Sequence, residues 1–316
     1  MKGVVTPASG LAGPLPAGAG AARASLASAG SWPDDWPHAA VSREVDAGGL
    51  RWHVQRMGAG PSCLLIHGTG ASTHTWRDMM PLLGRHFDVV AIDLPGHGFS
   101  GPLPPAARPT LPAMGRAVVG LLETLDCAPA VAVGHSAGAA ILARMALDEG
   151  IRPAHLVALN GAFFPFNERM NTLFSGVARA FATAPLMARL VARRGREPRA
   201  VERLMETTGS RLDGEGIELY ARLLGEADHV RSVLSMMANW DLSTLADEMI
   251  GLRPALHLVV GANDRTVSPG QARRLQEKLP AATLDVLPGL GHLAHEEAPA
   301  RVVKLIEQRI GEGVSA

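Results

Sequence analysis

The sequence lacks several features that would assign it to a particular class of protein. It has two cysteines, Cys63 and Cys127, which are too few for a disulfide framework and show no CxxC spacing for a metal site. We therefore expect a reducing compartment and two thiols that only pack in the fold. Lysine plus arginine and aspartate plus glutamate both count 30, so the formal net charge is zero. A neutral chain has no general attraction to nucleic acid or other polyanions.

Long apolar stretches are also missing. No run of 18 or more apolar residues occurs, which predicts that no helix spans a membrane. The first 31 residues are mostly Ala, Gly, Pro and Ser, and they lack the Leu- or Ile-rich centre of a secretory signal. We expect residues 1–31 to be a disordered extension, and the small residues of 24–30 leave an export signal as the alternative. No phosphate loop or GxGxxG motif follows a strand, so no cofactor is expected.

Short apolar runs dominate the rest of the chain. Residues 43–58 are typical of two strands joined at a Gly48–Gly49 turn. Six further strand-like runs follow, separated by segments of helix length: CLLIHG, DVVAIDLPG, AVAVG, HLVALNG, ALHLVVG and TLDVLPG. This alternation predicts an α/β fold with an eight-stranded, mostly parallel sheet and helices on both faces.

The strand pattern is interrupted once. Between residues 162 and 245 it is replaced by helical segments rich in Arg, Met and Leu, and it resumes at ALHLVVG. We therefore expect an inserted helical cap at 162–245, between two parts of one core, 32–161 and 246–316. Such a cap would lie beyond the carboxyl end of a strand, where ligands bind in open α/β sheets.

The stretch VAVGHSAGAAIL places Ser136 between a strand and a helix. Its GHSAG core fits GxSxG, the nucleophile elbow, in which Gly134 and Gly138 leave room for a tight turn. Ser136 would have a strained backbone and a hydroxyl that projects above the sheet. The next helix would point its positive end and the Ala137 N–H toward a developing oxyanion. In a chain with 35 glycines, a simple tight turn is the alternative interpretation.

A serine nucleophile needs a base and a carboxylate that orients the base, in the chain order Ser, acid, His. Asp264 follows the strand ALHLVV, and His292 follows the strand TLDV. Because both lie at carboxyl ends of strands, the topology of the sheet would gather them above Ser136. A turn or helix cap at Asp264, and His295 as the base, are the alternatives. Asp93 and His97 in DLPGHG are explained more simply by a loop that shapes the pocket wall.

The oxyanion hole needs a second backbone donor from a loop after an earlier strand. The HGTG segment, 67–70, is that loop. The N–H of Thr69 is the candidate donor, and that of Gly70 is the alternative. His67 would hold the loop by hydrogen bonds, and it lacks partner ligands for a metal ion, so no metal site is expected.

From Trp32 to its end the chain resembles the α/β-hydrolase superfamily, because HGTG, DLPGHG, GHSAG, GANDRTV and GHLAHEE occur in that order. More narrowly, the opening segment 32–61, the block HGTGASTHTWRDMMPLL and the cap segments TTGSRLDGEG and MMANWDL resemble the magnesium-chelatase accessory proteins of bacteriochlorophyll biosynthesis. The long extension before Trp32 departs from that family. The resemblance implies a cytoplasmic protein linked to magnesium insertion into protoporphyrin in photosynthesis, with no known substrate.

Two hypotheses about function follow. The first is a serine hydrolase acting on an ester or related carbonyl; carbon–carbon bond hydrolases and perhydrolases look similar at the triad, whereas dehalogenases and epoxide hydrolases carry Asp as the nucleophile. The second is a non-catalytic protein that binds a porphyrin or chelatase subunits beneath the cap. Possible contacts are Phe163 and Trp240, with Phe164, Phe166 and the arginines at 189, 193, 194, 196, 199 and 203. Packing aromatics and a solvated helix face would explain the same residues.

Overall fold

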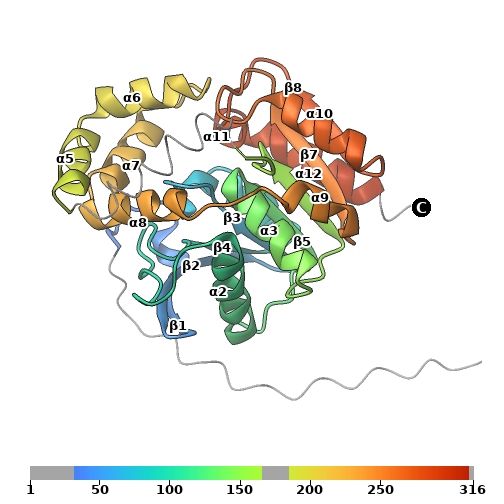
Figure 1. Cartoon of the computed structure of the whole chain (residues 1–316), viewed down its shortest axis with the longest axis horizontal. Helices are drawn as coiled ribbons and strands as arrows, with labels where there is room; N and C mark the ends of the chain where they lie inside the picture. Colours follow the sequence, from blue (N-terminus) through green and yellow to red (C-terminus); the bar gives the residue numbers. More distant parts are fainter. Residues whose placement is uncertain (1–31, 166–184, 313–316) are drawn as a thin grey trace, which may run out of the picture.

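A computed structural model describes residues 32–165 and 185–312. Its centre is one eight-stranded sheet in the order β1-β2-β4-β3-β5-β6-β7-β8 (Figure 1). The bounds are β1 Ser42–Ala47, β2 Leu50–Gly58, β3 Ser62–Ile66, β4 Asp88–Ile92, β5 Val131–His135, β6 His155–Leu159, β7 Ala255–Gly261 and β8 Thr283–Leu287. Only β2 runs antiparallel to its two neighbours, β1 and β4. The predicted eight-stranded, mostly parallel sheet is confirmed.

The first two strands form a hairpin because two glycines close it. Gly48 and Gly49 have φ values of 60° and 74°, a pair of positive angles that glycine adopts without steric cost. The register pairs Ala47 with Leu50 and continues to Ser42 with Gln55. The hairpin therefore forms where the sequence predicts it.

The central strands are buried on both faces because helices cover both. On β3, Leu64 and Ile66 belong to one hydrophobic cluster, whereas Cys63 and Leu65 belong to another. This alternation distributes one continuous apolar run between two cores. The first core includes residues of α2 (Leu111–Thr124), α3 (Ala137–Leu147) and α10 (Pro269–Lys278), and the second includes residues of α1 (Met80–Leu83) and α12 (Pro299–Glu312).

In the described part of the chain between β6 and β7, the helices are α5 (Pro185–Gly195), α6 (Pro198–Thr207), α7 (Gly214–Leu224), α8 (Ala227–Ala238), α9 (Leu245–Glu248) and the 3-10 helix η3 (Met249–Gly251). α5 to α8 gather beside the sheet (Figure 1). α6 and α7 share an apolar cluster with Ala71 and Leu293, which lie on loops of the core. The cap limits 162–245 stay a prediction, and the extension 1–31 lies outside the described residues.

Two further expectations concern helices and thiols. Among the described residues, no helix is both long and apolar enough to cross a membrane. Cys63 and Cys127 are free and buried. Burial raises the pKa of the Cys63 thiol to about 12, so this group stays protonated and unreactive.

Candidate active site

Ser136 lies in a strained turn between β5 and α3. Its φ of 51° and ψ of −115° are unusual for a residue with a side chain. Its backbone N–H donates to the Leu159 carbonyl of β6 over 3.0 Å, which anchors the turn on the neighbouring strand. Serine at a helix start commonly caps the helix, but the Ser136 side chain makes no capping bond. The hydroxyl of this partly buried serine is therefore not used by the helix that it precedes.

The turn requires glycine on both sides of the serine. A Cβ on Gly134 would lie 2.5 Å from the Ala139 nitrogen, and one on Gly138 would lie 2.2 Å from the Ile66 carbonyl oxygen. Both distances are far below van der Waals contact with backbone atoms that cannot move away. The sequence expectation of small residues at these two positions is confirmed.

Asp264 and His292 contact each other directly. The Nδ1–H of His292 donates to Asp264 Oδ2 over 2.8 Å, and the Asp264 side chain is completely buried. The same oxygen accepts from Asn160 Nδ2 over 2.7 Å. The other carboxylate oxygen accepts from the backbone N–H groups of Thr266 and Val267 at 2.8 and 2.9 Å. Four donors therefore orient the carboxylate, and the contact with His292 leaves Nε2 as the ring nitrogen that could take a proton.

His295, the alternative base, contacts Thr75 and not Asp264. Its Nε2 is 2.7 Å from the Thr75 hydroxyl, and its ring is buried. Burial, with smaller contributions from His292 and Arg77, lowers the pKa of His295 to about 3, so this ring stays neutral. The structure thus pairs Asp264 with His292 and not with His295.

The HGTG loop lies against the serine turn. A Cβ on Gly68 would be 2.8 Å from His135 Nδ1 and 3.1 Å from the Cβ of Ser136, so glycine allows the loop to approach the turn this closely. The Ala71 N–H donates to the Gly68 carbonyl, and Gly70 has a φ of 83°, which glycine accommodates without strain. His67 Nε2 accepts from the Leu94 N–H over 2.9 Å, so His67 holds the loop as the sequence predicts.

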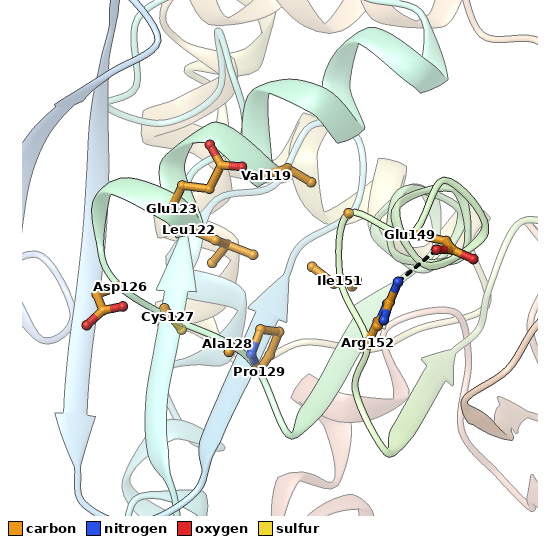
Figure 2. Close-up of a pocket in the computed structure, with 11 residues that line it drawn as sticks. Val119, Leu122, Glu123, Asp126, Cys127, Ala128, Pro129, Glu149, Ile151 and Arg152 are labelled. Carbon is orange, nitrogen blue, oxygen red and sulfur yellow. Dashed lines mark hydrogen bonds and ion pairs between the residues drawn. The ribbon is translucent and has the colours of Figure 1, made fainter. Parts of the chain in front are cut away.

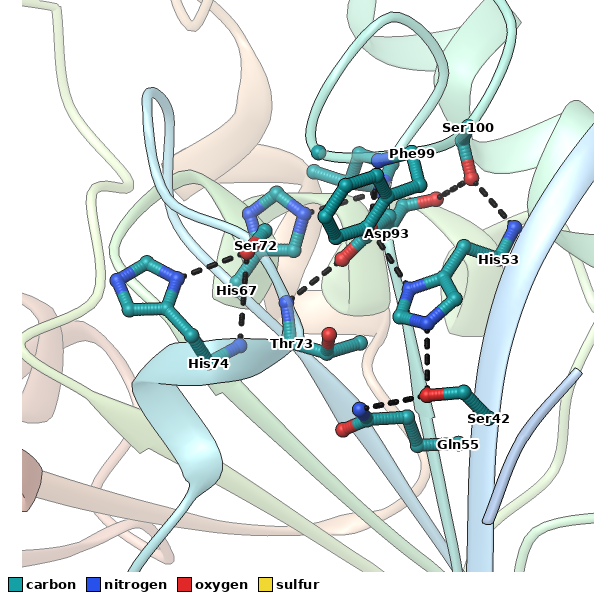
Figure 3. Close-up of polar contacts among 12 residues, drawn as sticks. Ser42, His53, Gln55, His67, Ser72, Thr73, His74, Asp93, Phe99 and Ser100 are labelled. Atoms are coloured by element: carbon teal, nitrogen blue, oxygen red, sulfur yellow. Dashed lines mark hydrogen bonds and ion pairs between the residues drawn. The ribbon is translucent and has the colours of Figure 1, made fainter. Parts of the chain in front are cut away.

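Asp93 connects the segments next to this loop, because it accepts hydrogen bonds from three of them. Its carboxylate accepts from His53 Nδ1 at 2.8 Å and from the N–H groups of Thr73 and Phe99 at 2.6 and 2.9 Å (Figure 3). Burial alone would raise the pKa of Asp93, but the adjacent His53 ring and the backbone donors outweigh burial and lower it. Ser42 bridges His53 to Gln55 on the opposite side of the ring. These contacts are structural, as the sequence argument on Asp93 favours.

Helix α8 reaches the same loops through His229. Its Nδ1 accepts from the Gly98 N–H at 3.2 Å, and its Nε2 donates to the Gly70 carbonyl at 3.3 Å. Burial lowers the pKa of His229 to about 4, so the ring remains neutral and can accept and donate at once. Sequence reasoning missed this residue because a lone histidine on a helix carries no recognisable signal.

The connector between α6 and α7 packs against the loops of Asp264 and His292. Ser210 Oγ accepts from the Leu293 N–H at 2.7 Å. A Cβ on Gly291 would lie 2.3 Å from the Gly209 carbonyl carbon, so the two backbone segments can approach this closely only because Gly291 has no side chain. Sequence reasoning did not single out Ser210. Its only signal was its place in TTGSRLDGEG, a segment that carries the family resemblance.

A buried ion pair between Arg77 and Glu296 lies in the same region, and α7 reaches it through the Tyr220 hydroxyl. Glu296 accepts from Arg77 at 2.8 Å through Oε2, and from Thr75 and Tyr220 at 2.5 and 2.8 Å through Oε1. Burial raises the pKa of Glu296, although these three partners oppose that effect. Within the described part of the chain, no group of three His, Cys, Asp or Glu residues is arranged to hold a metal ion.

The aromatic residues near the cap pack into the core. Phe163 is 2% exposed within the larger cluster, and Trp240 is partly buried against the same cluster. Phe164 lies under the Arg274 guanidinium at 4.6 Å. Phe166 lies outside the described residues. A contact of Phe163 or Trp240 with a substrate stays a prediction, as do the roles of Ser136, Asp264, His292, Thr69 and Ala137.

Two hollows lie at opposite edges of the sheet. One, of about 840 Å³, is lined by the connector 209–211 and the loop 262–265, which carries Asp264. The other, of about 350 Å³, lies between the end of α2 and segment 149–152 (Figure 2). Its residues precede β5 and β6, so it opens at the amino ends of these strands, away from the carboxyl edge on which Ser136 and His292 lie.

Comparisons of sequence relate the chain to known proteins. The pattern of the alpha/beta hydrolase family matches residues 63–305. A magnesium-chelatase 30 kDa subunit from Rhodobacter capsulatus is 35% identical over 268 residues, which cover 84% of this chain and 93% of that protein.

Comparisons of structure give the same fold. An alpha/beta hydrolase fold protein from Burkholderia ambifaria superposes with a TM-score of 0.71 at 22% identity, covering 84% of this chain and 97% of the other. A thermophilic esterase from Thermogutta terrifontis gives 0.67 at 22% identity, covering 86% and 98%. At this identity the likeness concerns the fold alone.

Proposed function

We propose that this chain, which belongs to the alpha/beta hydrolase family, is a serine hydrolase that acts on an ester or a related carbonyl compound. The observation that carries the proposal is the 2.8 Å contact between His292 Nδ1 and the buried Asp264 carboxylate. It is supported by a serine in a strained turn whose hydroxyl does not cap its helix. A scaffold without chemistry has no need for this combination.

In the proposed reaction, His292 Nε2 takes the proton from the Ser136 hydroxyl as its oxygen attacks the carbonyl carbon. Asp264 keeps the proton on Nδ1 and stabilises the imidazolium that forms. The N–H groups of Thr69 and Ala137 would receive the oxyanion. His292 then gives the proton to the leaving group. In the second half of the reaction His292 takes a proton from water as the water oxygen attacks the acyl carbon, and it returns this proton to the Ser136 oxygen as the acid is released.

We assign residues 162–245 to a cap over a core of 32–161 and 246–316. His229 and Ser210, which both lie in this segment, contact the loops that carry Gly70 and Leu293. The cap would select the substrate, and Phe163 and Trp240 are its candidate contacts at the cap entrance.

We further propose that the protein acts in the cytoplasm as an accessory to magnesium chelation in bacteriochlorophyll biosynthesis. This part depends on the similarity to the Rhodobacter capsulatus magnesium-chelatase subunit. The substrate would then be a tetrapyrrole-related ester or another small ester of that pathway, and chelatase subunits would be partners. The second candidate, a non-catalytic protein that binds a porphyrin or the chelatase, is favoured by the same similarity, because that relative is named as a subunit.

A serine-directed fluorescent phosphonate and short p-nitrophenyl esters separate the two candidates. Labelling and turnover should occur in the full chain and vanish in Ser136→Ala, with a loss of turnover of up to about a million-fold. Ser268→Ala, which removes an exposed hydroxyl at the start of α10, is the matched control and should keep both. An unlabelled parent protein would overturn the hydrolase proposal and make porphyrin titration the next measurement.

A further inference from the structure

Helix α5 exposes its two leucines to solvent and buries two alanines instead. Its inner face is formed by Ala188 and Ala192, which pack on Val230 of α8. Leu186 and Leu190, one turn apart, are 74% and 58% exposed. A helix that serves only to fill a core buries its leucines and exposes its smaller or polar residues. The outward leucines therefore need an explanation other than packing within the described chain.

The exposed leucines lie among arginines. Between residues 189 and 203 the chain has six arginines and two glutamates, in a protein whose formal net charge is zero. All six arginines are exposed, and within the described residues none of them forms a salt bridge. Two more apolar side chains are exposed on these helices, namely Leu204 of α6 at 48% and Val191 of α5 at 40%. α5 and α6 lie at the periphery of the molecule, beyond α7 and α8 (Figure 1).

We propose that this surface, the α5–α6 face, docks on an anionic lipid membrane without crossing it. The α5–α6 face consists of Leu186, Leu190, Val191 and Leu204 with Arg189, Arg193, Arg194, Arg199 and Arg203. On α5, Arg189 and Arg193 flank Leu186 and Leu190 on one side, and Arg194 flanks them on the other. Aliphatic side chains that enter the boundary of the acyl chains, with arginines at the level of the headgroups, are the pattern of an interfacial helix.

The composition of the face favours a membrane over a protein partner. Protein interfaces concentrate aromatic residues in their centres, and residues 185–207 contain no Phe, Trp or Tyr. Flexible Arg and Leu side chains on convex helices suit a fluid surface, which adapts its shape to them. Because the net charge of the face is positive, binding should require anionic lipid and weaken with salt.

Flotation of the full-length protein with lipid vesicles tests the proposal. We expect binding to phosphatidylcholine vesicles that contain a third phosphatidylglycerol, reduced at high salt, and little binding to phosphatidylcholine alone. Leu186→Ser with Leu190→Ser, and separately Arg193→Gln with Arg194→Gln, should each weaken the partition coefficient by about tenfold or more.

Matched control variants distinguish binding through the α5–α6 face from nonspecific binding through other exposed apolar or cationic side chains. Ile250→Ser removes an apolar side chain that is 67% exposed elsewhere, and Arg116→Gln with Arg273→Gln removes two other exposed arginines. These variants should bind as the parent does, and circular dichroism checks that all variants fold. No vesicle binding by the parent, or equal binding by the variants of the α5–α6 face, would overturn the proposal. So would a protein dimer that the leucine variants dissociate in the absence of vesicle binding, since the occupant would then be a second copy of the chain.

Discussion

Ser210 Oγ accepts a hydrogen bond of 2.7 Å from the backbone N–H of Leu293, so the connector between α6 and α7 holds the residue next to His292. Ser210 is completely buried, which removes water as a competing partner. His292 is therefore held from two sides, by Asp264 at its ring and by Ser210 at the adjoining peptide. Ser210 would act as a positioning residue for the proposed base.

Ser210→Ala should lower kcat for p-nitrophenyl esters by about fivefold and leave KM nearly unchanged, because one hydrogen bond of about 1 kcal/mol no longer restrains the His292 loop. Steady-state kinetics and the rate of phosphonate labelling measure this. Ser268→Ala should reduce stability by up to about 1 kcal/mol with an unaltered kcat. Equal kcat values in the two variants would refute a positioning role for Ser210.

Gly70→Ala should destabilise the protein by about 1–2 kcal/mol, because a side chain is strained at a φ of 83°. Lack of room is not the cause, since the nearest atom to the new Cβ would be Val233 Cγ1 at 3.9 Å. Gly120→Ala in α2, where the new Cβ meets nothing within 4 Å, should instead be neutral or stabilising by up to about 1 kcal/mol. Urea unfolding of both variants gives the comparison, and a Gly70→Ala protein as stable as the parent would contradict it.

Arg77→Met should cost about 3–5 kcal/mol, because it leaves the buried Glu296 carboxylate without its cationic partner. Tyr220→Phe removes only one neutral donor to Glu296 and should cost about 1–2 kcal/mol. Adding Glu296→Gln to Arg77→Met should restore part of the loss, since the buried group is then uncharged. Denaturant unfolding of the single and double variants checks the order, and additive effects would show that the two groups do not interact.

Stability should fall as the pH is lowered from 7 to 5. Burial lowers the pKa of seven histidines in the folded state, so the unfolded chain binds more protons below its histidine pKa of about 6.5. They are His67, His74, His97, His135, His155, His229 and His295. With folded pKa values of about 4 and about 3, His229 and His295 would each account for about 2 kcal/mol of the loss. The raised pKa of Glu296 opposes this trend with a single group.

Urea unfolding at pH 5, 6 and 7 measures this dependence. His229→Gln should unfold with a shallower pH slope than the parent, whereas His86→Gln, at an exposed surface position, should keep the parent slope. A stability that is constant from pH 7 to 5 would contradict the assignment of neutral, buried histidines.

Much of the fold could be predicted from the sequence because its signals are local. The Gly48–Gly49 turn, the strand-length apolar runs and the glycines around Ser136 each depend on a few neighbouring residues. The contact between Asp264 and His292 could also be anticipated, because both follow parallel strands of one sheet and so reach the same edge. The chain order of Ser136, Asp264 and His292 was thus enough to propose the site.

The contacts that hold this site could not be predicted in the same way. Asn160 and Asp264 are 104 residues apart, and His229 and Gly70 are 159 apart. Neither pair has a pattern that would link its members, because a buried hydrogen bond depends on where two elements meet and not on the residues beside each partner.

Helix α5 shows the division most clearly. The sequence alone determined that residues 185–195 carry leucines and arginines at helical spacing, and periodicity would place the leucines inward. The tertiary structure decided the opposite orientation, in which Ala188 and Ala192 face α8 and Leu186 and Leu190 face outward. The physical reason is that the rotation of a helix about its axis is set by the surface it packs on: alanines let α5 approach α8 closely, and the leucines are left on the surface.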